Sequence, residues 1–219
     1  MSIDMAEPVL VEESVPSKLS TVLKEFIECL PKNIIHHDYL MALVIVLLSE
    51  VGFRVDMPQE EVEESRWCQY SSRLLRDWKS QESGTYRINF HLHSIPTLRC
   101  RFVATPNGDV LILNFLPSET SNIGRSMAVQ TLKYVNPYSS DINDRFLNLK
   151  EFSQRLKNQL ATPILVYLLT EVGLPSPSLL GLPVELKLRI LSFLDKRSIG
   201  RLARTCKEFR DLSQNHAVR

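Results

Sequence analysis

Two histidine-containing segments carry the residue types that metal binding or acid–base catalysis requires. The first is His36-His37-Asp38, with two imidazoles beside a carboxylate, and the second is His91-x-His93. Side chains alternate along an extended strand, so His91 and His93 would share one face of it. With Cys100 on the following strand they could form a three-ligand zinc site in a metal-dependent enzyme. A zinc site needs further hydrogen-bonded support around its ligands, so histidines on a solvent-facing strand surface are the simpler interpretation.

Other motifs that could carry chemistry are sparse. The sequence has no Gly-rich phosphate loop, nucleophile elbow or HExxH pair, and it contains only seven glycines. Cys206 lies close to Arg204 and Lys207, whose charges would favour a reactive thiolate. An unpaired Cys is more often a small buried packing residue, however. We therefore expect a non-catalytic protein without a bound metal or cofactor.

Composition limits the kinds of partner that the protein can bind and the cellular compartment that it can occupy. The chain has 219 residues, is 44% hydrophobic and has a formal net charge of +1, which argues against a general nucleic-acid or anionic-membrane binder. Its four cysteines lack the paired spacing of a zinc site or a disulfide framework, so we expect reduced thiols. No signal peptide is evident, and the most apolar stretch, 39–48, is too short to span a bilayer. These features predict a cytoplasmic or nuclear protein.

Hydrophobic periodicity predicts helices in the first part of the chain. An apolar stripe indicates a helix that begins near Ser17 or Ser20. A second helix is expected from Tyr39 to Glu50, with Asp38 as its N-cap and Gly52 just past its end. This second segment is apolar on nearly every side, so it should lie beneath other elements.

The period then changes to that of extended strands. Four strands are predicted, at Tyr86–Leu92, Leu98–Thr105, Val110–Leu116 and Arg125–Val135. The middle two are joined through Pro106-Asn107-Gly108, which is a hairpin signal. A two-residue Asn107-Gly108 turn would pair Phe102 with Leu113, whereas a three-residue loop with a Gly bulge would pair Phe102 with Ile112. Pro suits the first turn position, so we favour the second register.

A last helical stretch follows the predicted strands. It begins near Asp141 or Asp144 and continues to Leu160, with a kink or a restart at Pro163. Helices, then a meander of strands, then helices indicate an α+β fold in which helices pack on an antiparallel sheet.

The C-terminal segment, 182–219, carries more apolar surface than so short a helical segment can bury alone. Leu186 and Ile190 lie on one face at helical spacing, whereas Leu188 and Leu191 begin a second face. Isolated domains below about 40 residues usually need a metal, a disulfide or a partner. Nine Lys and Arg against four acids also suit an acidic partner surface. We therefore expect a partner-binding module.

This segment resembles an F-box. The resemblance rests on Leu182-Pro183-x-Glu185-Leu186-Lys187-Leu188-x-Ile190-Leu191-x-x-Leu194-Asp195 and on Cys206-Lys207-x-Phe209. It implies three helices that dock on the Skp adaptor of a cullin-RING (SCF) ubiquitin ligase. The implied adaptor contacts are Leu182, Pro183, Leu186, Ile190, Leu191, Leu194 and Leu202. Two departures from the family are Gly200, which should cost about 1 kcal/mol inside the second helix, and an end without the usual Leu-Trp, as in a truncated F-box.

The preceding part of the chain resembles an FP domain, which is shared by a proteasome-inhibitor family and by F-box proteins of the F-box only protein seven and Nutcracker type. The resemblance is carried by the apolar helix that ends at Gly52, by Trp78 followed by Tyr86, by the Pro106-Asn107-Gly108 hairpin, and by the apolar helix before Pro163. It implies an FP domain that dimerises with itself or binds the FP domain of a proteasome regulator.

The expected organisation has four parts, namely a flexible tail at 1–16, an FP domain at 17–174, a linker at 175–181 and an F-box at 182–219. The resemblances imply a substrate-receptor subunit of an SCF ubiquitin ligase, with the Skp adaptor, the cullin scaffold and a protein substrate as partners. One alternative is an FP protein that binds a proteasome regulator and has a weak or vestigial F-box. The alternative of another class is the metal-dependent enzyme at His91 and His93.

Overall fold

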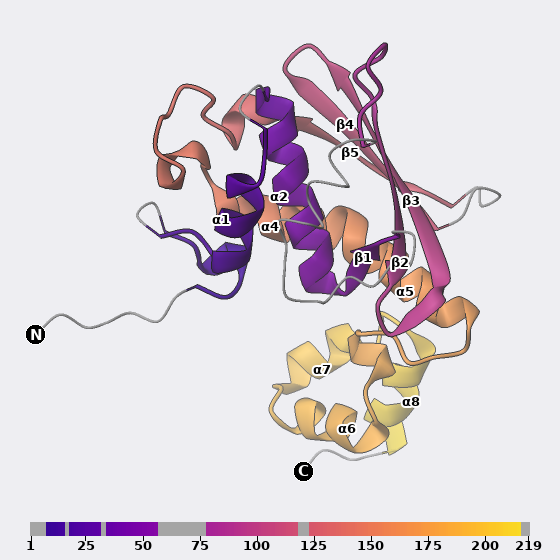
Figure 1. Ribbon diagram of the computed structural model, residues 1–219. Helices are drawn as coiled ribbons and strands as arrows, with labels where there is room; N and C mark the ends of the chain where they lie inside the picture. The colour runs from indigo at the N-terminus through magenta and orange to yellow at the C-terminus, as the bar shows by residue number, and fades with distance from the viewer. Residues whose placement is uncertain (1–7, 16–17, 32–33, 57–77, 118–122, 216–219) are drawn as a thin grey trace, which may run out of the picture. The chain divides into compact units, whose positions relative to one another are not determined.

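The computed structural model describes residues 8–15, 18–31, 34–56, 78–117 and 123–215 (Figure 1). Half of the predicted tail and the last residues of the predicted F-box therefore lie outside the described residues. Contacts within the chain divide it into two units, Met1–Leu168 and Leu169–Arg219. We describe each unit by itself.

A five-stranded antiparallel sheet forms the centre of the N-terminal unit, which confirms the predicted α+β class. Its strands are β1 (Phe53–Val55), β2 (Tyr86–Leu92), β3 (Ile95–Asn107), β4 (Val110–Leu116) and β5 (Arg125–Gln130). They lie in the order β1-β2-β3-β4-β5, and every neighbouring pair is antiparallel. The sequence predicted β2 and β4 with the correct bounds but missed the short strand β1.

Helices cover one face of this sheet. They are α1 (Thr21–Glu28), α2 (His36–Val51), α4 (Leu149–Leu156) and the start of α5 (Thr162–Glu171), with short helices η1 (Val11–Glu13), η2 (Thr131–Lys133), η3 (Asn143–Arg145) and the π-helical η4 (Lys157–Ala161). In Figure 1, α1, α2 and α4 lie on the same side of the sheet. Helix α2 contacts β1, and η4 contacts β4 and β5.

The core lies between the sheet and α2. Every residue of α2 from Leu40 to Leu48 is buried, as its all-round apolar sequence predicted. On the sheet, Phe102 of β3 packs against Phe90 and Phe115, with ring centroids 6.2 and 5.8 Å away. Such aromatic clusters bury large apolar areas and favour edge-on contacts. The N-terminal unit therefore has a large apolar core of its own.

The β3–β4 hairpin has a register that neither prediction gave. Phe102 pairs with Phe115, and Asn107 pairs with Val110, so the turn consists of Gly108 and Asp109. Gly108 has a φ of 59°, which fits the first central position of a type II′ turn and suits glycine. Both predicted registers are wrong because the pairing of the buried aromatics decides the register, and the turn forms where that pairing places it.

The boundaries of α2 also differ from the prediction at one end. The helix begins at His36, so Asp38 is its third residue, and Ile35 is the N-cap. The Asp38 carboxylate accepts a hydrogen bond from the Ile35 backbone N–H at 2.8 Å, which is the reverse half of a capping box. The prediction of Asp38 as N-cap is therefore wrong. At the other end, Gly52 ends the helix in the left-handed region with a φ of 106°, as predicted.

The helical stretch after the sheet starts later than predicted but restarts where expected. Residues 143–145 form the separate short helix η3, and α4 begins at Leu149. The wider π-helix η4 follows α4 directly, and α5 begins at Thr162. Pro163 thus falls in the first turn of α5, where its missing N–H costs least.

The C-terminal unit is helical, in agreement with the predicted three-helix segment. Its elements are η5 (Leu179–Gly181), α6 (Val184–Ser192), α7 (Lys196–Leu202) and α8 (Lys207–Asn215). Helix α7 contacts α8. Asp195 caps α7, because its side chain accepts a hydrogen bond from the Ser198 N–H at 2.8 Å.

Candidate functional site

Asp38 is the anchor of a buried polar cluster at the start of α2. Its side chain accepts hydrogen bonds from the Tyr86 hydroxyl at 2.7 Å and from the Lys79 ammonium at 2.9 Å, in addition to the bond from Ile35. Burial, followed by the bond to Asp38, raises the pKa of Tyr86, so this hydroxyl remains a neutral donor. With three donors bound, the carboxylate is a structural acceptor rather than a free catalytic base.

The adjacent His37 is also fully engaged. Its Nε2 lies 2.9 Å from the Gly108 carbonyl oxygen, and its Nδ1 lies 2.8 Å from the Thr131 hydroxyl. A carbonyl oxygen can only accept, so Nε2 carries the proton and Nδ1 accepts from Thr131. Burial lowers the pKa of His37 below its usual value and favours this neutral tautomer. Neither ring nitrogen is left for a substrate or a metal.

The proposed zinc ligands do not come together. Cys100 lies opposite Phe90 on the core face of the sheet and is buried, whereas His91 points to the other face and lies 3.9 Å from an Asp56 carboxylate oxygen. His93 follows β2 in the exposed turn before β3. Within the described ranges, no group of three or more His, Cys, Asp or Glu side chains could hold a metal ion. The hypothesis of a zinc site at His91, His93 and Cys100 is wrong, because alternation along β2 and β3 separates the thiol from His91.

Cys100 and Cys206 are free thiols. Burial raises the pKa of Cys100 to about 12, so this thiol is unreactive.

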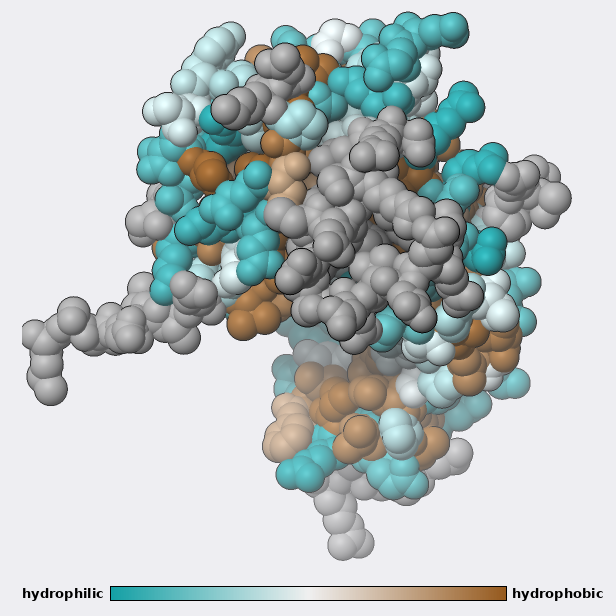
Figure 2. Space-filling view, viewed as in Figure 1, coloured by the Kyte–Doolittle hydropathy of each residue, from teal (hydrophilic) through white to brown (hydrophobic). Residues whose placement is uncertain are grey.

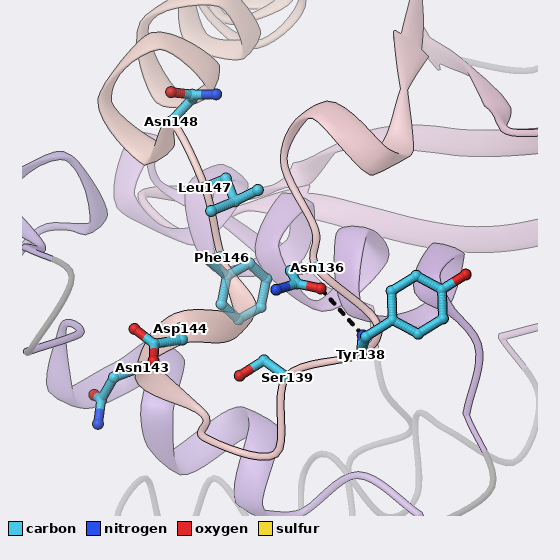
Figure 3. A pocket seen from close by; sticks show the side chains of 8 residues that line it. All are labelled: Asn136, Tyr138, Ser139, Asn143, Asp144, Phe146, Leu147 and Asn148. Atoms are coloured by element: carbon cyan, nitrogen blue, oxygen red, sulfur yellow. Dashed lines mark hydrogen bonds between the residues drawn. The ribbon is translucent and has the colours of Figure 1, made fainter.

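A surface pocket of about 610 Å³ lies in the connection between η2 and α4 (Figure 3). Its polar lining groups are largely occupied by bonds within the connection itself. The Asn136 side chain accepts a hydrogen bond from the Tyr138 N–H at 3.1 Å, and the Ser139 hydroxyl donates to the Asp141 carbonyl at 3.0 Å. Asn148 donates to the Lys133 carbonyl at 3.2 Å. Neither His nor Cys is among the lining residues.

The C-terminal unit has a different character, because little of its apolar surface is buried. Among its described residues, only Leu191 and Phe209 are buried apolar side chains. Lys187 is buried as well, and its ammonium pairs with Glu208 of α8. This ion pair ties α6 to α8 across a core that consists of very few side chains.

Five large exposed apolar side chains of this unit lie between η5 and the C-cap of α6, whereas exposed Val172 and Leu174 precede them. The five are Leu179, Leu180, Val184, Leu186 and Phe193, and we call this set the apolar face. Phe193 is 77% exposed and Leu186 is 47% exposed. Leu186, Ile190 and Phe193 follow the i, i+4, i+7 spacing of one helix face. Figure 2 shows hydrophobic side chains gathered on the visible surface of this unit. Exposed patches of this kind mark protein-binding sites.

The structure places the predicted contact residues in three environments. Pro183 and Leu186 are exposed, and four more are half-buried, namely Leu182, Ile190, Leu194 and Leu202. Leu191 has no exposed surface and belongs to the small core of this unit. The predicted set omitted Val184 and Phe193, although Phe193 shares the helical spacing of Leu186 and could have been found by that signal.

Comparison with known proteins identifies the C-terminal unit. The sequence profile of F-box-like domains matches residues 179–218. F-box only protein 7 of Homo sapiens is 28% identical over 93% of this chain and 38% of its own length. Protein nutcracker of Drosophila melanogaster is 34% identical over 50% of this chain and 37% of its own length. F-box protein SKIP22 of Arabidopsis thaliana is 41% identical over 30% of this chain and 14% of its own length.

The chain thus carries an F-box-like domain and is homologous to F-box only protein 7 and Nutcracker, as the sequence predicted. It spans about 38% of the length of F-box only protein 7. The boundaries of the predicted FP domain stay a prediction. Among the described helices, none has the length and hydropathy needed to cross a membrane.

Proposed function

We propose that this chain, which carries an F-box-like domain and resembles F-box only protein 7 and Nutcracker, is a non-catalytic substrate-receptor subunit of an SCF ubiquitin ligase. In this proposal the C-terminal unit docks on a Skp adaptor, and the adaptor links it to the cullin scaffold. Ubiquitin transfer then takes place on other subunits. This chain contributes by holding a protein substrate near the site of transfer, where proximity and orientation accelerate the reaction.

The observation that carries the proposal is the imbalance between buried and exposed apolar side chains in the C-terminal unit. Two described apolar side chains are buried there, whereas the apolar face has five exposed ones. Full burial of a large apolar side chain contributes about 1.5–3 kcal/mol. A partner that covers Phe193 and Leu186 would therefore gain several such contributions, and these two residues would be the strongest contacts.

Co-elution with a purified Skp adaptor tests the docking step. The variant Leu186→Asp with Phe193→Asp should not co-elute, because each carboxylate would enter the apolar interface without a partner. Leu174→Asp is a matched control, since Leu174 is 44% exposed and precedes the F-box-like residues. Circular dichroism of both variants checks that the helices remain folded. Co-elution of the double variant at the level of the control would contradict the proposal.

For the N-terminal unit, we propose the partner that the FP resemblance implies, which is a second FP domain from this chain or from a proteasome regulator. The face of the sheet away from the helices supports this role. It carries the half-buried apolar side chains Val103, Ile112 and Leu116, surrounded by exposed polar groups such as Arg87 and Asn89. A central apolar area with a polar rim is the usual anatomy of a protein interface.

The edge of the sheet is a less suitable site for this partner. The outer strand β5 exposes backbone groups that an added strand could pair with. However, Arg155 already donates a hydrogen bond to the Ala128 carbonyl on this edge, at 3.0 Å. An added strand would have to displace Arg155, so we place the interface on the sheet face.

Analytical ultracentrifugation of the full chain tests this second step. We expect a dimer, or a heterodimer after addition of an FP-domain proteasome regulator. Ile112→Glu should abolish the association because it places a charge in the apolar centre of the face. Gln154→Glu is the control, since Gln154 is exposed on α4, which lies on the other side of the sheet. A chain that stays monomeric and does not bind the regulator would contradict this step, but it would not affect the proposal of adaptor docking.

A further inference from the structure

Helix α7 and the turn that follows it carry three exposed arginines. Arg197 and Arg201 lie one helical turn apart on α7, and Arg204 follows in the turn after the helix. Gly200 lies on the same face between them and is also exposed. We call these four residues the arginine face. It is separate from the apolar face, which lies in η5 and α6.

The charge of this region is not neutralised by nearby acids. Residues 196–210 contain six Lys and Arg and one acid, Glu208. Glu208 pairs with the buried Lys187, and Asp195 just before the helix uses its carboxylate as the N-cap. In the described part of the chain, the structure records no ion pair for any of the six basic side chains. Their positive potential is therefore directed to solvent.

Gly200 has no structural role within the chain that would require glycine. It is not among the glycines with positive φ, and a Cβ added at this position would meet nothing within 4 Å. Glycine in the middle of a helix lowers stability relative to Ala, because it has more conformational freedom to lose on folding. What it offers is a place where another backbone can approach the helix closely. At Gly200 this place lies in the centre of a basic surface.

We propose that the arginine face binds an acidic segment of a protein partner. The backbone of the segment passes over Gly200, and its carboxylates pair with Arg197, Arg201 and Arg204. Arginine suits this role because its planar guanidinium binds a carboxylate through two parallel hydrogen bonds. The surface is short, and the net charge of the chain is only +1, so charge complementarity favours a short acidic peptide over a nucleic acid or an anionic membrane.

Fluorescence anisotropy with the full chain tests the charge requirement. The probe is a fluorescein-labelled peptide of alternating Glu and Ala. Arg201→Glu with Arg204→Glu should weaken its binding by about tenfold, and added salt should weaken the wild-type complex. Lys24→Glu with Lys150→Glu is the matched control, because it makes the same charge change at exposed positions of the N-terminal unit outside the proposed sheet interface. Equal weakening in both double variants would overturn the proposal.

Gly200→Gln tests the close approach. The variant should raise the thermal stability of the protein, since Gln is a better helix former, yet it should weaken peptide binding several-fold by filling the contact point. A merely structural role for Gly200 would not move these two measurements in opposite directions. Unchanged peptide affinity in Gly200→Gln would overturn the proposal, as would tighter binding to duplex DNA or to phosphatidylserine vesicles than to the peptide.

Discussion

The two units of the chain differ in how many of their apolar side chains they bury. The N-terminal unit buries almost the whole of α2 and one face of a five-stranded sheet. The described C-terminal unit buries only Leu191 and Phe209 and leaves the apolar face exposed. The first is a self-sufficient scaffold. In the proposed function, the second is one half of an interface whose remaining core belongs to a partner.

Truncation of large apolar side chains should give the largest difference in stability loss between the two units. Phe102→Ala removes a fully buried ring that contacts Phe90 and Phe115, and should cost about 3–5 kcal/mol of stability. Leu186→Ala removes an exposed side chain and should change stability by less than about 0.5 kcal/mol. Urea denaturation followed by circular dichroism measures both. Similar losses in the two variants would break the distinction between the units.

The polar cluster around Asp38 should behave as part of the scaffold. Asp38→Asn removes the charge that accepts from Tyr86 and Lys79, and should cost about 2–3 kcal/mol. Glu25→Gln provides a control at an exposed position of α1. Thermal denaturation should show a clearly lower melting temperature for Asp38→Asn and an unchanged one for Glu25→Gln. A loss no larger than that of the control would mean that the cluster contributes no net stability.

The ion pair in the C-terminal unit offers a finer comparison. Glu208→Gln leaves the buried Lys187 without its partner and should destabilise the unit by about 1–2 kcal/mol, a reduced figure because Glu208 itself is partly exposed. Lys187→Met removes the buried charge altogether and should be neutral or stabilising. Hydrogen exchange of α8 distinguishes the variants. Equal losses in both would show that the pair itself, rather than the burial of Lys187, determines the effect.

The smallest expected effect is the pH dependence that His37 imposes on the N-terminal unit. Burial lowers its pKa in the folded state below the ordinary 6.5, so below pH 6.5 the unfolded chain binds more protons than the folded one. The contribution of neutral His37 to the free energy of unfolding should therefore be fully present above pH 6.5. It should decrease as the pH falls below this value. His37→Gln should flatten this part of the pH profile of the denaturation midpoint. A profile that is unchanged by the substitution would exclude His37 as its source.

Strong local patterns were sufficient to predict several elements. The alternation in Tyr86–Leu92 gave β2 with its bounds, and the apolar run after Asp38 gave the buried helix α2 and its end at Gly52. The spacing of Leu186 and Ile190 predicted a binding module in the C-terminal segment, and this segment matches the F-box-like profile. In each of these cases the local signal and the tertiary structure favour the same conformation.

The errors arose where tertiary contacts override local preference. The β3–β4 register follows the packing of Phe102 against Phe115, which the turn residues alone could not indicate. Asp38 was expected to be the N-cap, but it is the third residue of the helix, and its carboxylate binds the Ile35 N–H, Tyr86 and Lys79. The burial of Leu191 could not be inferred from the sequence, because helical spacing alone does not show which apolar face turns inward.

The central claim is that the C-terminal unit is completed by a partner. Hydrogen exchange measured by mass spectrometry on the full chain, with and without a purified Skp adaptor, tests it most directly. We predict that α6 to α8 exchange rapidly alone and become strongly protected by the adaptor, whereas β2 to β4 are protected throughout and do not change. Protection of α6 to α8 equal to that of the sheet in the free chain, and unaltered by the adaptor, would contradict the account.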